Sequence, residues 1–185
     1  MLQETGRVIW ITGLSGAGKS TLAAALTNKL RVHRKVVLLD GDELRAVFGA
    51  SSEFPNNHDR SARLALALQY AHLCRMIANQ GVIVVIATIS LFREVHAWNR
   101  ANLPNYFEVY LKVPIEELRR RDSKGIYRRF DAGVLLHVAG LDVPVDEPEA
   151  PDWVVEFDPA RSVNDVVNEL SCQLQLDNET NNHEN

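Results

Sequence analysis

The stretch GLSGAGKST, residues 13–21, contains the residue types that hold a polyphosphate. Gly13, Gly18, Lys19 and Ser20 have the spacing G-x-x-x-x-G-K-[ST]. Glycines let successive backbone N–H groups turn towards an anion, and a following helix adds partial positive charge. Lys19 would reach the β- and γ-phosphates of a nucleotide, and Ser20 would hold magnesium. A chance glycine-rich turn is disfavoured, because a β-rich run precedes the motif and a helical run follows it.

A second motif, LLDGDELR, supplies carboxylates at the end of the next apolar run. Asp40 and Asp42 flank Gly41 there. Open parallel sheets bind ligands at the carboxyl ends of their strands, so both aspartates should face the phosphates. One can order magnesium while the other accepts the proton of an acceptor hydroxyl, as a kinase requires. The structural alternative is a helix N-cap at Asp42, and the two roles are compatible.

A basic block lies further along the chain, with Gly125 as a candidate hinge. Its members are Arg119, Arg120, Arg121, Lys124, Arg128 and Arg129. Guanidinium groups match phosphate oxygens, and positive charge over a transferring phosphoryl group is a main catalytic device. A solvated basic helix end is an equally good interpretation from these residues alone.

The elements that must position these groups alternate between strand and helix. β-rich or apolar runs predict five strands, at residues 7–12, 35–40, 82–90, 106–113 and 152–158. Helical composition and spacing predict helices at residues 20–30, 57–79, 114–123 and 163–174. The pattern predicts an α/β fold of the P-loop kinase type, with a doubly wound five-stranded parallel sheet, helices on both faces and a short basic lid. We expect one domain over residues 1–174 and a disordered tail over residues 175–185.

Composition restricts the function class. The 185 residues are 46% hydrophobic and 24% charged, and the net charge of −4 disfavours a general nucleic-acid binder. The longest apolar run, residues 82–89, is too short to span a bilayer, and no basic-then-apolar leader opens the chain. We therefore expect a cytoplasmic protein without membrane partners, in which Cys74 and Cys172 are reduced thiols facing the core.

Taken together, the motifs resemble the adenylylsulfate kinase family. That family carries GLSGxGKST, DGDxxR, a Phe followed by DR, ISPYR, RDxKGxY and GID, in this order. This chain has the corresponding segments GLSGAGKST, DGDELR, Phe54, Asp59-Arg60, ISLFR at 89–93, RDSKGIY at 121–127 and GLD at 140–142. The resemblance runs from about Val8 to Phe157.

The resemblance implies transfer of the ATP γ-phosphoryl group to the 3′-hydroxyl of adenylylsulfate, with Mg²⁺, in a possible homodimer. The implied catalytic residues are Lys19, Asp42, Asp40 and Ser90, the last often labelled a phosphoserine intermediate that direct in-line transfer does not need. The implied metal residues are Ser20 and Asp40. The implied ATP contacts are Gly13, Leu14, Ser15, Gly16, Ala17, Gly18, Lys19, Ser20, Thr21 and Arg121. The implied acceptor contacts are Arg45, Phe54, Arg60, Ile89, Arg93, Lys124 and Tyr127.

Departures from the family pattern fall on the acceptor side. Arg63 occupies the slot of an Asn and Ala65 that of an Arg, while Val138 replaces a second base-stacking Phe. The chain also resembles a branch found with bacterial surface-polysaccharide genes, one member of which phosphorylates cytidine diphosphoramidate. That acceptor is the first alternative. A non-catalytic nucleotide-binding module is the second, and the intact Lys19 and aspartate pair count against it.

Overall fold

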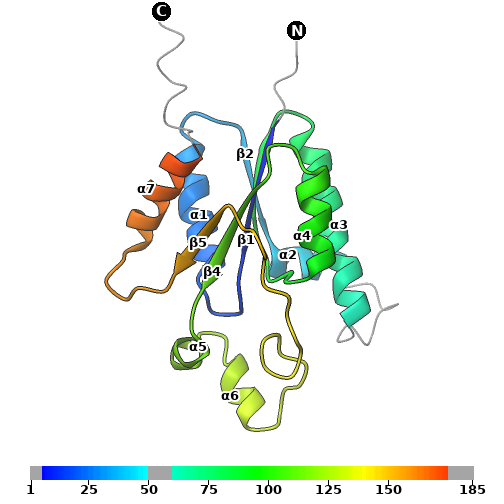
Figure 1. Cartoon of the computed structure of the whole chain (residues 1–185), viewed down its shortest axis with the longest axis vertical. Coiled ribbons are helices and arrows are strands. Elements are labelled where there is room, and N and C mark those ends of the chain that lie inside the picture. The colour runs from blue at the N-terminus through cyan, green and yellow to red at the C-terminus, as the bar shows by residue number, and fades with distance from the viewer. Residues whose placement is uncertain (1–5, 50–59, 175–185) are drawn as a thin grey trace, which may run out of the picture.

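A computed structural model of the chain describes residues 6–49 and 60–174, in which five strands form one parallel sheet (Figure 1). The strands are β1 (Arg7–Thr12), β2 (Val36–Asp40), β3 (Ile83–Ala87), β4 (Phe107–Lys112) and β5 (Trp153–Glu156). Their order is β2-β3-β1-β4-β5, and every neighbouring pair is parallel. The five-stranded parallel sheet predicted from the sequence is confirmed.

Helices cover both faces of this sheet. They are α1 (Lys19–Leu30), α2 (Gly41–Gly49), α3 (Arg60–Ala78), α4 (Arg93–Asn102), α5 (Ile115–Arg121), α6 (Ile126–Asp131) and α7 (Val163–Gln173). Figure 1 shows α1 and α7 on one face and α3 and α4 on the other. For α2 the sequence predicted only a possible helix start at Asp42, and it did not predict α4 or α6 as separate helices. In α4 the reason is its polar composition, since only Val95 and Asn99 are buried there.

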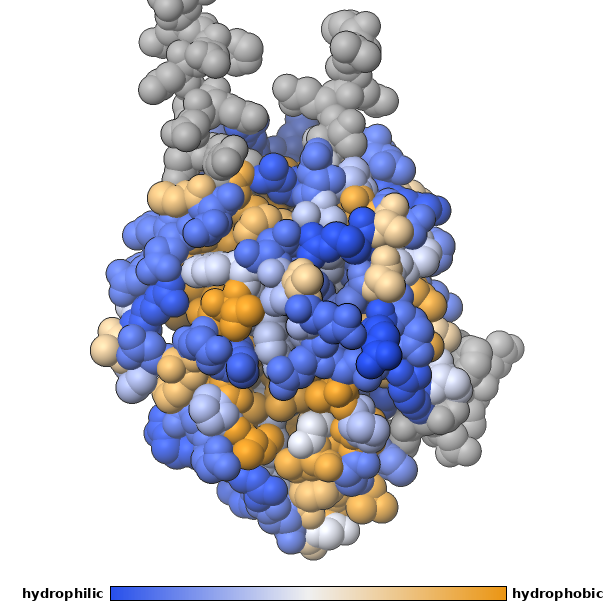
Figure 2. Space-filling model, viewed as in Figure 1, coloured by the Kyte–Doolittle hydropathy of each residue, from blue (hydrophilic) through white to orange (hydrophobic). Residues whose placement is uncertain are grey.

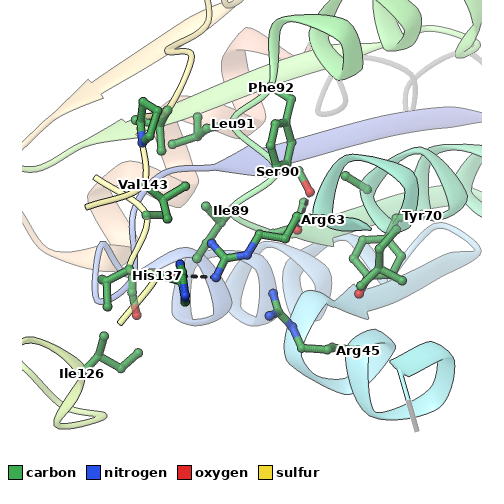
Figure 3. A pocket seen from close by; sticks show the side chains of 18 of the residues that line it. Arg45, Arg63, Tyr70, Ile89, Ser90, Leu91, Phe92, Ile126, His137 and Val143 are labelled. Atoms are coloured by element: carbon green, nitrogen blue, oxygen red, sulfur yellow. Dashed lines mark hydrogen bonds between the residues drawn. The ribbon is translucent and has the colours of Figure 1, made fainter. Parts of the chain in front are cut away.

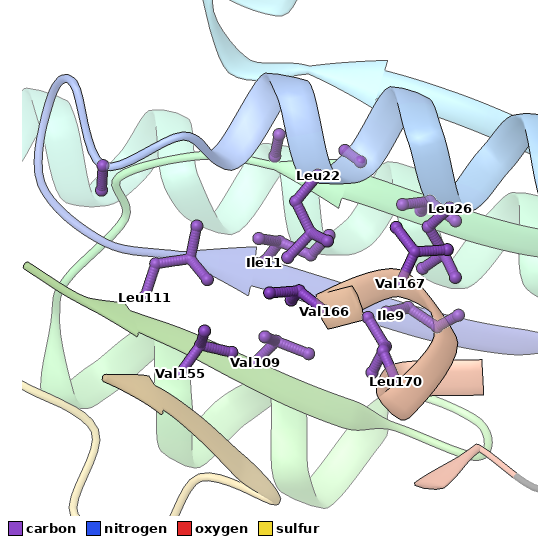
Figure 4. Close-up of a cluster of buried hydrophobic side chains, with 14 of the residues drawn as sticks. Ile9, Ile11, Leu22, Leu26, Val109, Leu111, Val155, Val166, Val167 and Leu170 are labelled. Atoms are coloured by element: carbon purple, nitrogen blue, oxygen red, sulfur yellow. The ribbon is translucent and has the colours of Figure 1, made fainter. Parts of the chain in front are cut away.

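Two cores flank the central strand, because successive side chains of a strand point to opposite faces. Ile9 and Ile11 of β1 pack with α1 and α7, as Figure 4 shows. Val8 and Trp10 point the other way, into a cluster with α3 and α4. All four side chains are fully buried, as expected for a parallel strand covered on both faces. The sheet is therefore a rigid base whose strand ends can carry loops.

The carboxyl ends of the strands lead towards the end of the molecule where α5 and α6 lie (Figure 1). Gly13 leaves β1 there with φ 148°, and a Cβ at this position would lie 2.7 Å from the carbonyl oxygen of Leu111. Only glycine fits both the backbone conformation and the space. The first glycine of the motif therefore lets the loop pass close against β4.

Two sequence predictions have different outcomes in the described ranges. Cys74 is buried and Cys172 is exposed, so the prediction that both thiols face the core is wrong for Cys172. Its position on α7 lies off the stripe formed by the buried Val166, Val167 and Leu170.

Residues 175–185, the expected tail, lie outside the described residues. Within the described residues, no helix combines the length and apolar character needed to cross a membrane.

Candidate active site

The loop between β1 and α1 has the geometry of an anion cradle. Gly16 and Gly18 both have positive φ, 80° and 99°, which glycine adopts without strain. Gly18 is the N-cap residue of α1, where it provides no side-chain cap, and the first turn of α1 contains no acidic residue. Backbone N–H groups at a helix N-terminus need acceptors, and a phosphate supplies them.

Lys19 lies across this loop. Its Nζ donates to the carbonyl oxygen of Leu14 at 2.8 Å. Burial, followed by the positive charge of Lys124, lowers the pKa of Lys19 to about 8, while Asp42 and Asp40 oppose the shift. The ammonium group is charged at neutral pH but poorly solvated, so a polyphosphate in the cradle would compensate it.

Ser20 and Asp40 meet beside the cradle, although they belong to different elements. The Ser20 hydroxyl donates to Asp40 Oδ2 at 2.5 Å, and Asp40 Oδ1 accepts from the backbone N–H of Asp42 at 2.9 Å. Hydroxyl and carboxylate oxygens are the ligands that Mg²⁺ prefers. The pair therefore fits the metal role expected from the sequence. The residue that caps the start of α2 is Asp40, which corrects the expectation that Asp42 would do so.

Asp42 extends into the space between the cradle and the lid, where its side chain is 67% exposed and forms an ion pair with Lys124. The hydrogen bond from Lys124 is the main cause that lowers the pKa of Asp42, and the charges of Arg45 and Lys19 act in the same direction. Asp42 is thus ionised at neutral pH. An ionised carboxylate can accept a proton once its cationic partner moves away.

The lid consists of α5, α6 and the turn that joins them, and it is fastened to the cradle. The Tyr127 hydroxyl donates to the carbonyl oxygen of Ser15 at 2.8 Å, and Tyr127 is almost fully buried. Arg121 lies over the ring of Phe157 at 4.9 Å and is ion-paired with Glu117. The expected hinge, Gly125, has φ 64°. Part of the basic block is therefore neutralised by neighbouring acids rather than free in solution.

Two cavities of about 250 Å³ each flank the cradle. The first, called the donor-side cavity here, lies next to Gly18 and Thr21 and is also lined by Arg121 and Phe157. The second, the acceptor-side cavity, begins at Ser15 and extends between α3 and the segment that follows α6 (Figure 3). The P-loop therefore separates two spaces, an arrangement that suits a reaction between two bound molecules.

The structure brings some of the expected acceptor contacts together but not others. Arg45 and Ile89 line the acceptor-side cavity, and so does Ser90, which was expected among the catalytic residues. Arg60 instead forms ion pairs with Glu94 and Asp146, both at 3.0 Å. Three further expected contacts do not line this cavity. The Arg93 side chain pairs with Glu149, Lys124 with Asp42, and Tyr127 with the cradle. Phe54 lies outside the described residues.

Ser90 occupies the wall of the acceptor-side cavity at the end of the β3 segment. It is only 6% exposed, its φ is 30°, and its hydroxyl lies 2.8 Å from that of Thr88. Left-handed backbone is uncommon for residues other than glycine and is found at functional sites. The strained turn presents Ile89 and Ser90 to the cavity.

Sequence reasoning missed the contribution of α3 to this cavity. Arg63, Leu66, Ala67 and Tyr70 all line it. Their spacing of i, i+3, i+4 and i+7 places them on one helix face, which would have revealed them as a group. Tyr70 is buried, but its hydroxyl has no hydrogen-bond partner among the described residues.

A parallel sheet with an anion cradle, a serine–aspartate pair and a basic lid defines a P-loop kinase. Residues 5–156 match the family described as adenylylsulphate kinase. The chain belongs to this family, whose members are phosphotransferases that use a hydroxyl acceptor.

Individual relatives differ in the acceptor that their names specify. Cytidine diphosphoramidate kinase of Campylobacter jejuni is 39% identical over 170 residues, covering 91% of this chain and 96% of the relative. Adenylyl-sulfate kinase of Deinococcus deserti is 39% identical over 171 residues, covering 92% of each chain. The APS kinase of Mycobacterium tuberculosis, solved in complex with AMPPNP and APS, has a TM-score of 0.83 and 31% identity, covering 93% of this chain and 99% of that one.

Proposed function

We propose that this protein transfers the γ-phosphoryl group of ATP to the ribose 3′-hydroxyl of a second nucleotide. The observation that carries the proposal is the pair of cavities on either side of the cradle, with Asp42 between the lid and the loop. One cavity would receive ATP and the other the acceptor. A transferring phosphoryl group needs two such substrates aligned on opposite sides.

Each group around the cradle has a separate task in this reaction. The N-terminus of α1 and Lys19 hold the β- and γ-phosphates of ATP. Ser20 and Asp40 would hold Mg²⁺, which would neutralise charge on the phosphates. Asp42 accepts the proton of the acceptor's 3′-hydroxyl while the 3′-oxygen attacks the γ-phosphorus. The bond between the γ-phosphorus and the oxygen that bridges to the β-phosphate breaks, and ADP leaves. Lys124 then has a phosphate partner in place of Asp42.

Adenylylsulfate is the first candidate acceptor, because most of the family's motifs survive in this chain and because the M. tuberculosis relative was solved with APS. Cytidine diphosphoramidate is the second candidate. It is favoured by Val138, an aliphatic residue of the acceptor-side cavity that replaces a stacking aromatic ring, since a smaller base needs less stacking surface.

The test is a panel of nucleotide acceptors incubated with ATP and Mg²⁺, in which ADP release is measured and products are identified by mass spectrometry. We expect a product heavier by one phosphate, on the ribose of one candidate acceptor. The Lys19→Ala variant serves as the inactive control. ATP binding without transfer to any nucleotide would contradict the proposal and favour a non-catalytic nucleotide-binding module.

A further inference from the structure

Arg63 crosses the acceptor-side cavity from α3 to the segment that follows α6. Its Nη2 donates to the carbonyl oxygen of His137 at 2.6 Å, a contact drawn as a dashed line in Figure 3. Its Nε is buried and has no acceptor among the described residues. The guanidinium group is thus held in a fixed position by one hydrogen bond while another of its donors remains unpaired.

No ion pair joins Arg63 to an acid within residues 6–49 and 60–174. Asp142, whose charge acts on Arg63, uses both carboxylate oxygens to accept from the backbone N–H groups of His137 and Val138, at 2.7 and 2.6 Å. Arg45 points towards Arg63 across the cavity (Figure 3), and burial together with this second cation lowers the pKa of Arg63. The described residues that line the cavity include no carboxylate. A ligand must therefore bring the acceptors.

The rest of the cavity is suited to a flat, largely apolar group. Its other walls include the side chains of Leu66, Ile89, Leu136 and Val143. On the face seen in Figure 2, apolar surface gathers at the end where Figure 1 places α5 and α6. Leu136, which belongs to the segment after α6, is exposed and lines the cavity. A nucleobase combines a flat apolar face with polar edges, so it fits this combination of walls.

We propose that Arg63 selects the acceptor's base and favours cytosine over adenine. This inference rests on the proposed function and concerns the same cavity. A guanidinium group offers only donors, in a planar fork. Cytosine presents two adjacent acceptors, O2 and N3, on one edge. Adenine has no edge with two adjacent acceptors, because its N7 and N1 each neighbour the donor N6. One N–H of Nη2 is used by His137. The fork formed by the remaining N–H groups of Nη1 and Nη2 would pair with cytosine, whereas adenine would leave one of these donors unpaired.

The test compares kcat/KM for adenylylsulfate and cytidine diphosphoramidate in wild type, Arg63→Lys and Arg63→Asn. Lysine keeps the charge without the fork, and asparagine offers one donor and one acceptor. The surviving motifs alone rank adenylylsulfate first, but the position of Arg63 predicts that wild type prefers the cytidine substrate. Either substitution should lower kcat/KM for cytidine diphosphoramidate by roughly tenfold or more, which is the range for one bidentate contact to a base. The loss of kcat/KM for adenylylsulfate should be much smaller. Arg75→Lys, on the same helix but over the ring of Trp98, is the matched control.

Dissociation constants of both acceptors, measured with AMPPNP present, give the same preference without turnover. Wild-type preference for adenylylsulfate would overturn the inference but leave the proposed kinase activity intact. An equal loss for both acceptors in Arg63→Lys would also overturn it, because it would indicate contact with a shared anionic group. Absence of turnover with any nucleotide, despite selective binding of the cytidine compound, would contradict the proposed function alone.

Discussion

Lys124 and Asp42 form an ion pair between the lid and the start of α2, 82 residues apart in the sequence. In the proposed reaction these two groups must separate before transfer, because a carboxylate bound to an ammonium group is a poor proton acceptor. Lys19 lies close enough for both Lys124 and Asp42 to influence its pKa. We infer that the phosphates of ATP draw Lys124 away and leave Asp42 free to act as the base.

Replacing Lys124 by Gln should move the acid limb of the kcat/KM profile to higher pH. The Lys124 hydrogen bond is the largest cause of the lowered pKa of Asp42, so its loss raises that pKa towards the ordinary carboxyl value. A higher pKa means that Asp42 is protonated, and inactive as a base, at a less acidic pH. The measurement is kcat/KM between pH 3 and 7 in both proteins. An unmoved limb would show that Asp42 is not the titrating group.

Lys19→Ala should lose phosphoryl transfer by several orders of magnitude while the fold remains intact. Lys19 is the charged side chain of the cradle itself, and its role is to stabilise the charge that develops on the transferred group. The checks are ADP release with acceptor present and the midpoint of thermal unfolding. Near-normal turnover would remove the P-loop assignment, whereas a large fall in the unfolding midpoint would make the activity result uninformative about catalysis.

Binding of ATP should weaken as pH rises above about 8, the pKa that burial and Lys124 give to Lys19. In the ATP-free protein, Lys19 loses its proton as the pH rises above its lowered pKa. Bound phosphates favour the charged form of Lys19. ATP binding must then take up a proton, and affinity falls by up to about tenfold per pH unit until the ordinary lysine pKa. Titration calorimetry between pH 7 and 10 measures this.

Lys19→Arg is the control for that titration. Arginine stays charged throughout this range, so the variant should bind ATP with little pH dependence, even if its affinity is lower. An equally steep loss of affinity in both proteins would assign the effect to another group.

Asp40→Asn and Asp42→Asn should fail in different ways. Asp42→Asn removes the proton acceptor, so kcat should fall far more than ATP affinity. Asp40→Asn removes the charge of the proposed magnesium ligand beside Ser20, so the Mg²⁺ concentration needed for half-maximal rate should rise. Rates measured over a range of Mg²⁺ concentrations separate the two effects. If both variants respond to Mg²⁺ alike, this division of labour is incorrect.

Val138→Phe should improve an adenine acceptor by roughly tenfold, which corresponds to about 1.4 kcal/mol of stacking energy, and should do little for a pyrimidine acceptor. Val138 is 6% exposed and lines the acceptor-side cavity, so the phenyl ring introduced by the substitution would extend into the proposed base site. The measurement is kcat/KM for adenylylsulfate and for cytidine diphosphoramidate. Equal gains for both acceptors would show that the ring does not contact the base.

The sequence by itself determined the sheet, the cradle and the family, because these depend on local patterns. Strand and helix periodicity can be recognised from neighbouring residues, as in the run RVIWIT that forms β1. The cradle requires glycine at fixed positions, and Gly13 and Gly18 of the motif both adopt a positive φ. Short, fixed spacings of this kind can be recognised without knowledge of distant contacts.

Only the tertiary structure decided which side chains meet. Arg60 was expected at the acceptor, but it pairs with Glu94 and Asp146, which lie 34 and 86 residues further along the chain. Arg63, noticed in the sequence only as a departure from the family pattern, reaches a carbonyl 74 residues away. The physical reason is that a long side chain can adopt several rotamers. Its partner is therefore fixed by the packing of elements that no local spacing relates.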